Sequence, residues 1–283
     1  MDVRKQGYLF FILGIFCYSF SDAIIKYFMP VYGVRQVIFF RTFFRFIPFL
    51  LFALYQRVNY LKTSRVKENI FRAVLASCGS YAYMCAYNYA PMVDVFTVGL
   101  STAIFMIPLG VFILKEKFCG RSIVATLLGF SGICLALRPG SGIFQPGIII
   151  AAIGAFIGAL NQIFIKKLTY TENELTIIFY HHSFLLTAAF FIGLPTLTPM
   201  SLNHTLLLFV GGTTAAAAQY CIIHSFKFSE LMKLAPFYYV MLIPDVMFDF
   251  FLYDKPPDAY IIGGLLLILL GTLIALRVRP QEA

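Results

Sequence analysis

Residues 7–28 read GYLFFILGIFCYSFSDAIIKYF, a run of 22 residues in which only Asp22 and Lys26 carry charge. A helix needs about 20 mostly apolar residues to cross the hydrocarbon core of a bilayer. The apolar residues here are consecutive, whereas a barrel strand would alternate apolar and polar residues. The run therefore predicts a membrane-spanning helix, because a helix satisfies its own backbone hydrogen bonds in lipid.

Nine further apolar runs follow, separated by short connections. With loose boundaries, the ten runs cover residues 7–28, 36–55, 70–89, 93–114, 123–137, 147–165, 175–194, 205–226, 234–252 and 260–276. The chain of 283 residues is 60% hydrophobic and 12% charged, with a mean hydropathy of +0.83. This composition excludes a water-soluble enzyme and a disordered chain. It predicts an all-α integral membrane protein with ten transmembrane helices.

The basic residues are unevenly distributed over the two ends of these helices. With the N-terminus in the cytoplasm, 16 of the 22 Lys and Arg residues fall at inner helix ends. Only Lys26, Arg35, Arg138 and Lys255 fall at outer ends. Cytoplasmic loops of membrane proteins are enriched in Lys and Arg. We therefore expect both termini in the cytoplasm, and we attribute the net charge of +9 to basic loops, with no nucleic-acid partner.

The two halves of the chain resemble each other. Gly14, Phe16, Ile25 and Lys26 match Gly154, Phe156, Ile165 and Lys166 at an offset of 140 residues, and Gly132, Ala136, Leu137 and Arg138 match Gly271, Ala275, Leu276 and Arg277 at an offset of 139. Each half holds five predicted spans. Because five is odd, the second half should enter the membrane from the opposite side. We expect two inverted five-helix repeats, residues 1–140 and 146–279, an arrangement typical of secondary transporters. An ancient duplication without transport is the alternative.

Several motifs resemble the EamA-type drug/metabolite transporters over nearly the whole chain. They are FFRTFF at 39–44, YNYAPMVDVFTVGLSTAIFMIPL at 87–109, LKEK at 114–117 and GFSGICLAL at 129–137. In the second half, Asp254 stands for Glu116 of LKEK, and His181 for Arg41 of FFRTFF. Within this family, SDAIIKY, FFRTFF, IFIKKL and APFYYVMLI resemble the bacterial S-adenosylmethionine uptake carriers. The resemblance implies a multi-pass protein of the bacterial inner (plasma) membrane that takes up S-adenosylmethionine, with exchange for S-adenosylhomocysteine as a further possibility.

Three pairs of charged residues lie within the spans, namely Asp22 with Lys26, Arg41 with Arg45, and Asp245 with Asp249. Charges inside a membrane are costly and mark functional positions. Residues four apart share one face of a helix. Each pair should therefore face the interior of the helix bundle.

These charges have two interpretations. In the structural one, Asp22 pairs with the lysine four residues later, and Arg41 and Arg45 neutralise Asp245 and Asp249. In the functional one, Asp22 and Arg41 bind substrate, Asp245 and Asp249 couple a proton or other charge to transport, and Arg45 is only an anchor.

Tyrosines within the spans are further candidates for substrate binding, above all Tyr18, Tyr81, Tyr83 and Tyr238. Aromatic faces attract cations and stack on flat bases. Such a cavity suits the sulfonium and adenine of S-adenosylmethionine. It equally suits an aromatic amino acid, a nucleoside or a quaternary amine, so these substrates, and export as the direction, stay open.

Three polar residues of the second half complete the candidate site. Gln162 occupies the repeat position of Asp22, with Asn161 beside it, and His181 occupies that of Arg41. The two amides could read a polar group of the substrate, or they could make only interhelical hydrogen bonds. Unperturbed histidine titrates near neutral pH, so His181 is a second candidate for proton sensing.

The sequence contains no motif of the other functional classes considered. GxxxxGK[ST], HExxH and GxSxG are absent from the sequence. The six cysteines form no CxxC pair, and we expect no metal or cofactor. The predicted partners are a small-molecule metabolite and the lipid bilayer, and the oligomeric state is open. A membrane enzyme or a receptor remains the alternative from another class.

Overall fold

The computed structural model describes residues 3–55, 63–86, 88–140, 145–193 and 197–277. Within these ranges the secondary structure is helical throughout and contains no strand. The helices are α1 (Val3–Tyr32), α2 (Val34–Tyr55), α3 (Val66–Ala86), α4 (Met92–Gly99), α5 (Thr102–Leu114), α6 (Gly120–Leu137), α7 (Pro146–Thr169), α8 (Glu174–Gly193), α9 (Leu202–Phe228), α10 (Leu231–Leu234), the 3₁₀-helix η3 (Ala235–Met241), α11 (Leu242–Tyr253) and α12 (Ala259–Leu276). The expected all-α fold is confirmed.

Seven segments of the described residues are long and apolar enough to cross a membrane. Five of them are the single helices α1, α6, α7, α9 and α12. The other two are interrupted: Val93–Leu114 covers α5 and all but the first residue of α4, and Leu231–Leu252 covers α10, η3 and all but the last residue of α11. Three further helices, α2, α3 and α8, have 22, 21 and 20 residues and carry arginine or histidine within their length.

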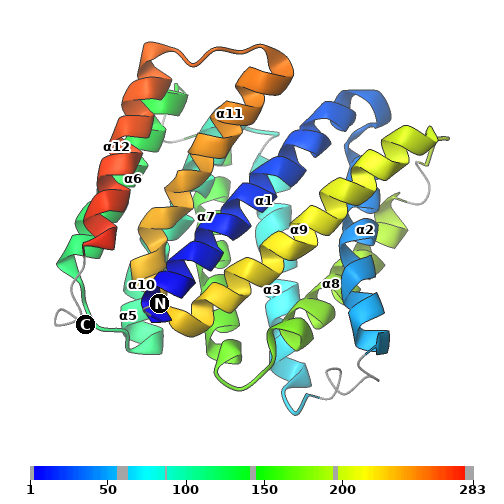
Figure 1. Ribbon diagram of the computed structural model, residues 1–283, viewed down its shortest axis with the longest axis horizontal. Helices are drawn as coiled ribbons and strands as arrows, with labels where there is room; N and C mark the ends of the chain where they lie inside the picture. Colours follow the sequence, from blue (N-terminus) through cyan, green and yellow to red (C-terminus); the bar gives the residue numbers. More distant parts are fainter. Residues whose placement is uncertain (1–2, 56–62, 87, 141–144, 194–196, 278–283) are drawn as a thin grey trace.

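The helices run roughly side by side in one bundle (Figure 1). α1 packs along α9, which also contacts α2, and α6 packs along α12. α3 packs along α7, and α2 along α8. Helices far apart in the sequence are therefore neighbours. Each of the pairs just named joins a helix of the first half of the chain to a helix of the second half.

Glycine permits the closest of these approaches. A Cβ atom on Gly14 of α1 would lie 2.7 Å from Ile222 Cγ1 of α9. A Cβ atom on Gly132 of α6 would lie 2.6 Å from the carbonyl oxygen of Gly264 on α12. Small residues let transmembrane helices pack backbone against backbone, where the hydrophobic effect offers no driving force.

Many large apolar side chains are exposed on the outside of the bundle. Phe112, Leu202 and Phe251 are more than 70% exposed. Large exposed patches of this kind mark a surface covered by another apolar phase. Acyl chains are the expected cover for a chain with these candidate spans.

The turns after the interrupted helices set the register of the repeat. Lys115 and Asp254 both adopt left-handed backbone conformations, with φ of 57° and 50°, directly after α5 and α11. The next amides, those of Glu116 and Lys255, donate to the carbonyls of Gly110 and Asp249. Asp254 therefore corresponds to Lys115 and not to Glu116 as expected, because the helix caps align at an offset of 139 residues.

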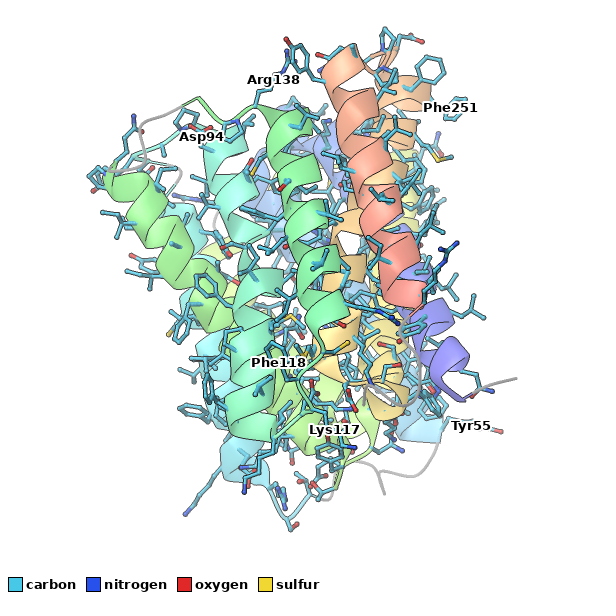
Figure 2. The ribbon with its side chains drawn as sticks, turned by 90° about the vertical axis from the view of Figure 1, so that its left-hand side faces the viewer. Tyr55, Asp94, Lys117, Phe118, Arg138 and Phe251 are labelled. Carbon is cyan, nitrogen blue, oxygen red and sulfur yellow. The ribbon has the colours of Figure 1, made fainter. Side chains whose placement is uncertain are left out.

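The two ends of the bundle differ in which charged residues they carry. α1 begins and α12 ends at one end (Figure 1), and Lys117 lies at that end, while Arg138 and Asp94 lie at the other (Figure 2). One expected member of the basic end lies elsewhere: Arg72 is fully buried within α3.

Candidate functional site

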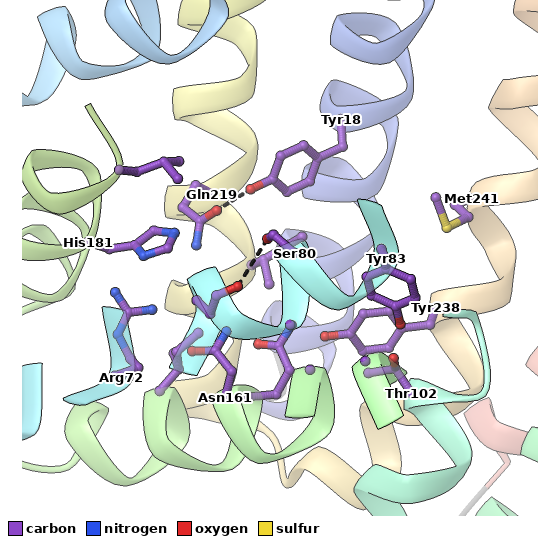
Figure 3. A pocket seen from close by; sticks show the side chains of 18 of the residues that line it. Tyr18, Arg72, Ser80, Tyr83, Thr102, Asn161, His181, Gln219, Tyr238 and Met241 are labelled. Atoms are coloured by element: carbon purple, nitrogen blue, oxygen red, sulfur yellow. Dashed lines mark hydrogen bonds between the residues drawn. The ribbon is translucent and has the colours of Figure 1, made fainter. Parts of the chain in front are cut away.

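A cavity of about 460 Å³ opens at the centre of the bundle (Figure 3). Its polar lining comes from both halves of the chain. The polar and charged lining residues are Tyr18, Asp22, Arg45, Arg72, Ser80, Tyr83, Thr102, Asn161, Gln162, His181, Gln219 and Tyr238, and the thioether of Met241 lies beside them. A cavity of this size matches the sites that hold small metabolites in other proteins.

Tyr18 joins three helices at one wall of the cavity. Its hydroxyl, on α1, donates to Gln219 Oε1 on α9. The guanidinium of Arg45, on α2, lies 5.3 Å from the centre of the Tyr18 ring. This distance is within the range of a cation–π contact.

The break between α4 and α5 forms another part of the wall. The hydroxyl of Thr102 donates to the carbonyl oxygen of Gly99 at 2.7 Å and contacts that of Ala155 on α7 at 3.2 Å. The Tyr83 hydroxyl also reaches the Gly99 carbonyl, at 3.4 Å. Side-chain hydroxyls thus satisfy a carbonyl that the interrupted helix leaves unpaired, as intramembrane helix breaks require.

His181 lies on α8 at the opposite side of the cavity from Tyr83 and Tyr238 (Figure 3). Its ring centre is 5.1 Å from that of His182. His182 is completely buried outside the cavity lining and stacks on Phe49 at 5.7 Å. Only the first histidine of the pair therefore faces the cavity.

Two ion pairs join the intramembrane charges of neighbouring helices. Arg41 Nη2 contacts Asp22 Oδ1, which joins α1 to α2. Lys26 Nζ lies 2.5 Å from Asp249 Oδ1, which joins α1 to α11. These two ion pairs connect α1 to α11 and to α2, so both acidic groups of the sequence prediction take part in contacts between helices. Asp245 lies near the same group of charges and beside Ser19.

The structure brings Tyr18, Asp22, Tyr83, Asn161, Gln162, His181 and Tyr238 together around the cavity. Four other predicted site residues do not line it. Arg41, Asp245 and Asp249 lie in or beside the ion pairs of α1. Tyr81 is 70% exposed on α3. Residues 81 and 83 point in different directions because they are two positions apart on a helix.

The polar lining residues that were not among the predicted site residues are Arg45, Arg72, Ser80, Thr102 and Gln219. The sequence predicts an anchor at Arg45 and a basic helix end at Arg72, and it assigns no role to Gln219. The signal for Arg72 was its place in the apolar sequence NIFRAVLA, where an arginine within a span is a functional candidate. Gln219 is the one amide within the apolar segment AAAAQY.

At the end that carries Lys117, Glu116 binds the start of α10. Its carboxylate accepts hydrogen bonds from the amides of Leu231 at 2.8 Å and Met232 at 2.9 Å. Burial raises the pKa of Glu116, while these amides and nearby Lys166 act in the opposite direction. Lys166 Nζ in turn donates to the carbonyl oxygens of Phe226 and Ser229 at the end of α9. Among the described residues no group of three His, Cys, Asp or Glu side chains could hold a metal ion.

Residues 5–138 match the EamA-like transporter family, and residues 145–277 match it again. The chain belongs to the EamA-like transporter family. This EamA-like transporter is therefore a multi-pass membrane protein with a small-molecule substrate, and not an enzyme.

Named relatives cover nearly the whole transporter. The S-adenosylmethionine uptake transporter of Rickettsia prowazekii is 29% identical over 95% of this chain and 91% of its own. The S-adenosylmethionine uptake transporter of Rickettsia conorii is 30% identical over 94% of this chain and 91% of its own. The pseudopaline exporter CntI of Pseudomonas aeruginosa is 21% identical over 99% of both chains. A crystal structure of a protein with 16% identity has a TM-score of 0.81 over 99% of both chains and shares the fold.

Proposed function

We propose that this EamA-like transporter is a secondary carrier that takes up S-adenosylmethionine through the central cavity. The observation that carries the proposal is that one cavity takes its polar lining from both halves of the chain. Transporters built from repeated halves bind their substrate at such an interface, near the midplane of the membrane. The names of the Rickettsia relatives support the substrate.

The chemistry of the lining suits the parts of this metabolite. Tyr18, Tyr83 and Tyr238 offer ring faces to an adenine or a sulfonium cation. Asn161 and Gln162 offer amide groups to hydroxyls and ring nitrogens. These five residues, with His181, form the proposed binding site.

The two acidic groups of the sequence prediction take different places in the proposal. Asp22 lines the cavity and is held by Arg41, so this pair would sense the substrate at its edge. Asp245 and Asp249 lie outside the cavity, beside Lys26. They stay candidates for coupling a proton or other charge to the movement of α1 against α11.

We further propose ten membrane spans in two inverted repeats, residues 1–140 and 146–279. In this scheme α1, α2, α3 and α6 correspond to α7, α8, α9 and α12, and α4 with α5 corresponds to α10 with α11. When each helix is replaced by its counterpart in the other half, the pair α1–α9 becomes the pair α7–α3. The pairs α2–α8 and α6–α12 are each converted into themselves. All of these contacts are present. Both halves also interrupt their fourth span, which supports the pseudo-two-fold relation.

The proposed setting is a bacterial inner membrane with both termini in the cytoplasm. The end of the bundle where α1 begins carries Lys115, Lys117, Arg121, Lys167 and Lys227. The other end carries Arg35, Arg138 and Lys255. The excess at the first end supports a cytoplasmic position for it.

Uptake of radiolabelled S-adenosylmethionine into proteoliposomes tests the proposal. We expect saturable uptake that protein-free vesicles lack and that needs no ATP. Preloading with S-adenosylhomocysteine and imposing a pH gradient separate exchange from proton coupling. Tyr238→Ala should reduce uptake at least about tenfold by removing a stacking face. The matched control Tyr81→Ala removes an exposed ring outside the cavity and should leave uptake unchanged.

Absence of uptake by protein that is inserted and folded would reject the substrate. Riboflavin and pseudopaline, named for other relatives, would then be tested in the same vesicles, with amino acids, nucleosides and quaternary amines. Equal losses in the two tyrosine variants would reject the cavity as the binding site.

A further inference from the structure

We infer that the end of the cavity formed by Arg72, His181 and Arg45 is a subsite for a carboxylate of the transported molecule. The inference rests on the proposed function, because it assigns a chemical group of the substrate to part of the same cavity. It narrows the substrate class to metabolites that join a carboxylate to a flat ring system.

Arg72 is the central observation. Its side chain is 0% exposed, on α3, and it lines the cavity. Its Nη2 atom donates to the carbonyl oxygen of Ile177 at 2.9 Å, which fixes the guanidinium against α8. Its Nε and Nη1 atoms are buried and have no hydrogen-bond partner within the described chain. A buried cation with unpaired donors is costly unless an anion joins it.

His181 and Arg45 add donors to the same region. The charged groups that act on His181 are Arg72 and Arg45, and both are cationic. Nδ1 of His181 and Nε of Arg45 are likewise buried without a hydrogen-bond partner in the described residues. Three nitrogen-bearing side chains from α2, α3 and α8 thus meet with unused donor capacity.

Among the described residues, no acidic side chain forms an ion pair with Arg45 or Arg72, although the charge of Asp22 acts on Arg45. Asp22 is the one acidic residue among the lining residues, and it binds Arg41 instead. Neither Arg45 nor Arg72 forms an ion pair with a described residue. The missing counter-charge is therefore supplied from outside the chain when the cavity is filled.

The opposite side of the cavity has the complementary chemistry. Figure 3 places Tyr83, Tyr238 and Met241 on the side away from Arg72 and His181. Aromatic rings and a thioether favour a flat, polarisable group. A guanidinium fork favours a carboxylate. The cavity is thus suited to an amino acid whose side chain ends in a planar ring, held with its carboxylate at Arg72.

Binding of matched ligand pairs by the purified full-length protein tests the subsite. Calorimetric titration compares S-adenosylmethionine with decarboxylated S-adenosylmethionine, and L-phenylalanine with L-phenylalaninamide. Within each pair that binds, we expect the ligand with the carboxylate to bind at least about 30-fold more tightly, because a ligand without it leaves the buried charges of the subsite unpaired. In Arg72→Gln the difference should fall below about threefold, since this variant keeps a polar hydrogen-bonding side chain but loses the charge.

Controls separate binding from folding. Arg121→Gln replaces an exposed arginine at the start of α6 and should keep the full difference. Thermal unfolding verifies that each variant is folded. If Arg72→Gln does not fold, Arg45→Gln and Arg72→Lys are used, and each should reduce the difference, because each removes charge or the planar fork.

The outcomes distinguish the two proposals. Binding of the phenylalanine pair alone, with a difference that depends on Arg72, rejects S-adenosylmethionine as substrate and retains the subsite. Equal binding with and without the carboxylate, or a difference that survives in the arginine variants, overturns the subsite. Failure of the folded protein to bind any member of the panel counts against both.

Discussion

Glu116 illustrates how one side chain can hold two distant segments together. It follows α5, yet its carboxylate accepts the first two amides of α10, more than a hundred residues later. The first amides of a helix have no partner within the helix, so a side chain must supply one. Glu116 therefore anchors the interrupted ninth span of the proposed arrangement to the end of the fourth.

Glu116→Ala should lower the free energy of unfolding by about 1–3 kcal/mol, because it leaves two buried amides of α10 unpaired. Thermal unfolding of the purified protein measures this loss. Glu68→Ala is the matched control, since Glu68 pairs with Arg65 on the surface of the described structure, and such a pair contributes little. An equal loss in both variants would contradict the capping role.

The raised pKa of Glu116 also predicts a pH dependence. A raised carboxyl pKa means that the folded protein favours the protonated form more than the unfolded chain does. The stabilisation by that proton is full below the ordinary pKa of a glutamate and is lost as the pH rises through the raised value. Glu116→Gln cannot titrate, so the stability of the native protein relative to this variant should decline over that range. A difference in stability between the two proteins that does not change with pH would show that burial does not raise the pKa of Glu116.

At the scale of the elements, the contact between α6 and α12 depends on glycine from both helices. Gly132 approaches the carbonyl of Gly264, and a Cβ atom on Gly271 would lie 2.7 Å from the carbonyl oxygen of Ala125. Both obstacles are backbone atoms, which cannot rotate away as a side chain can. The two helices can keep this separation only without side chains at these points.

Gly132→Ala should therefore force α6 and α12 apart and destabilise the fold by about 1–3 kcal/mol. Gly120→Ala is the control on the same helix, because a Cβ atom there meets nothing within 4 Å. The control should be neutral or slightly stabilising, since alanine favours helix more than glycine does. Unfolding midpoints of the two purified variants provide the comparison. A loss in Gly120→Ala as large as in Gly132→Ala would indicate a backbone effect unrelated to packing.

At the scale of the whole molecule, the two ends of the bundle should face different compartments. Lys117→Cys and Gly140→Cys place a thiol at exposed positions beyond α5 and α6, at opposite ends. A membrane-impermeant maleimide should label Gly140→Cys in intact cells and Lys117→Cys only after permeabilisation. The unsubstituted protein gives the background from its own cysteines. The reverse pattern would show that the basic end faces outward.

Much of the fold could be predicted from the order of residues along the chain. Consecutive apolar residues, as in the segment around Phe16, specify helices because lipid offers the backbone no other partner. The repeated positions of Gly14 and Gly154 predicted related halves. The tyrosines and amides of the site were also predictable, because polar residues within a span are rare and conspicuous.

The pairing of charges and the lining of the cavity were decided only by the tertiary structure. Arg41 and Arg45 lie on one helix one turn apart, yet one binds Asp22 and the other faces the cavity. Spacing along a helix specifies a shared face but not which neighbouring helix meets each turn of it. Arg72 reads as a loop cation from its position and is fully buried in α3. Local physics therefore determines the helices, whereas the partners of a side chain depend on crossings between helices that lie as much as 223 residues apart in the sequence.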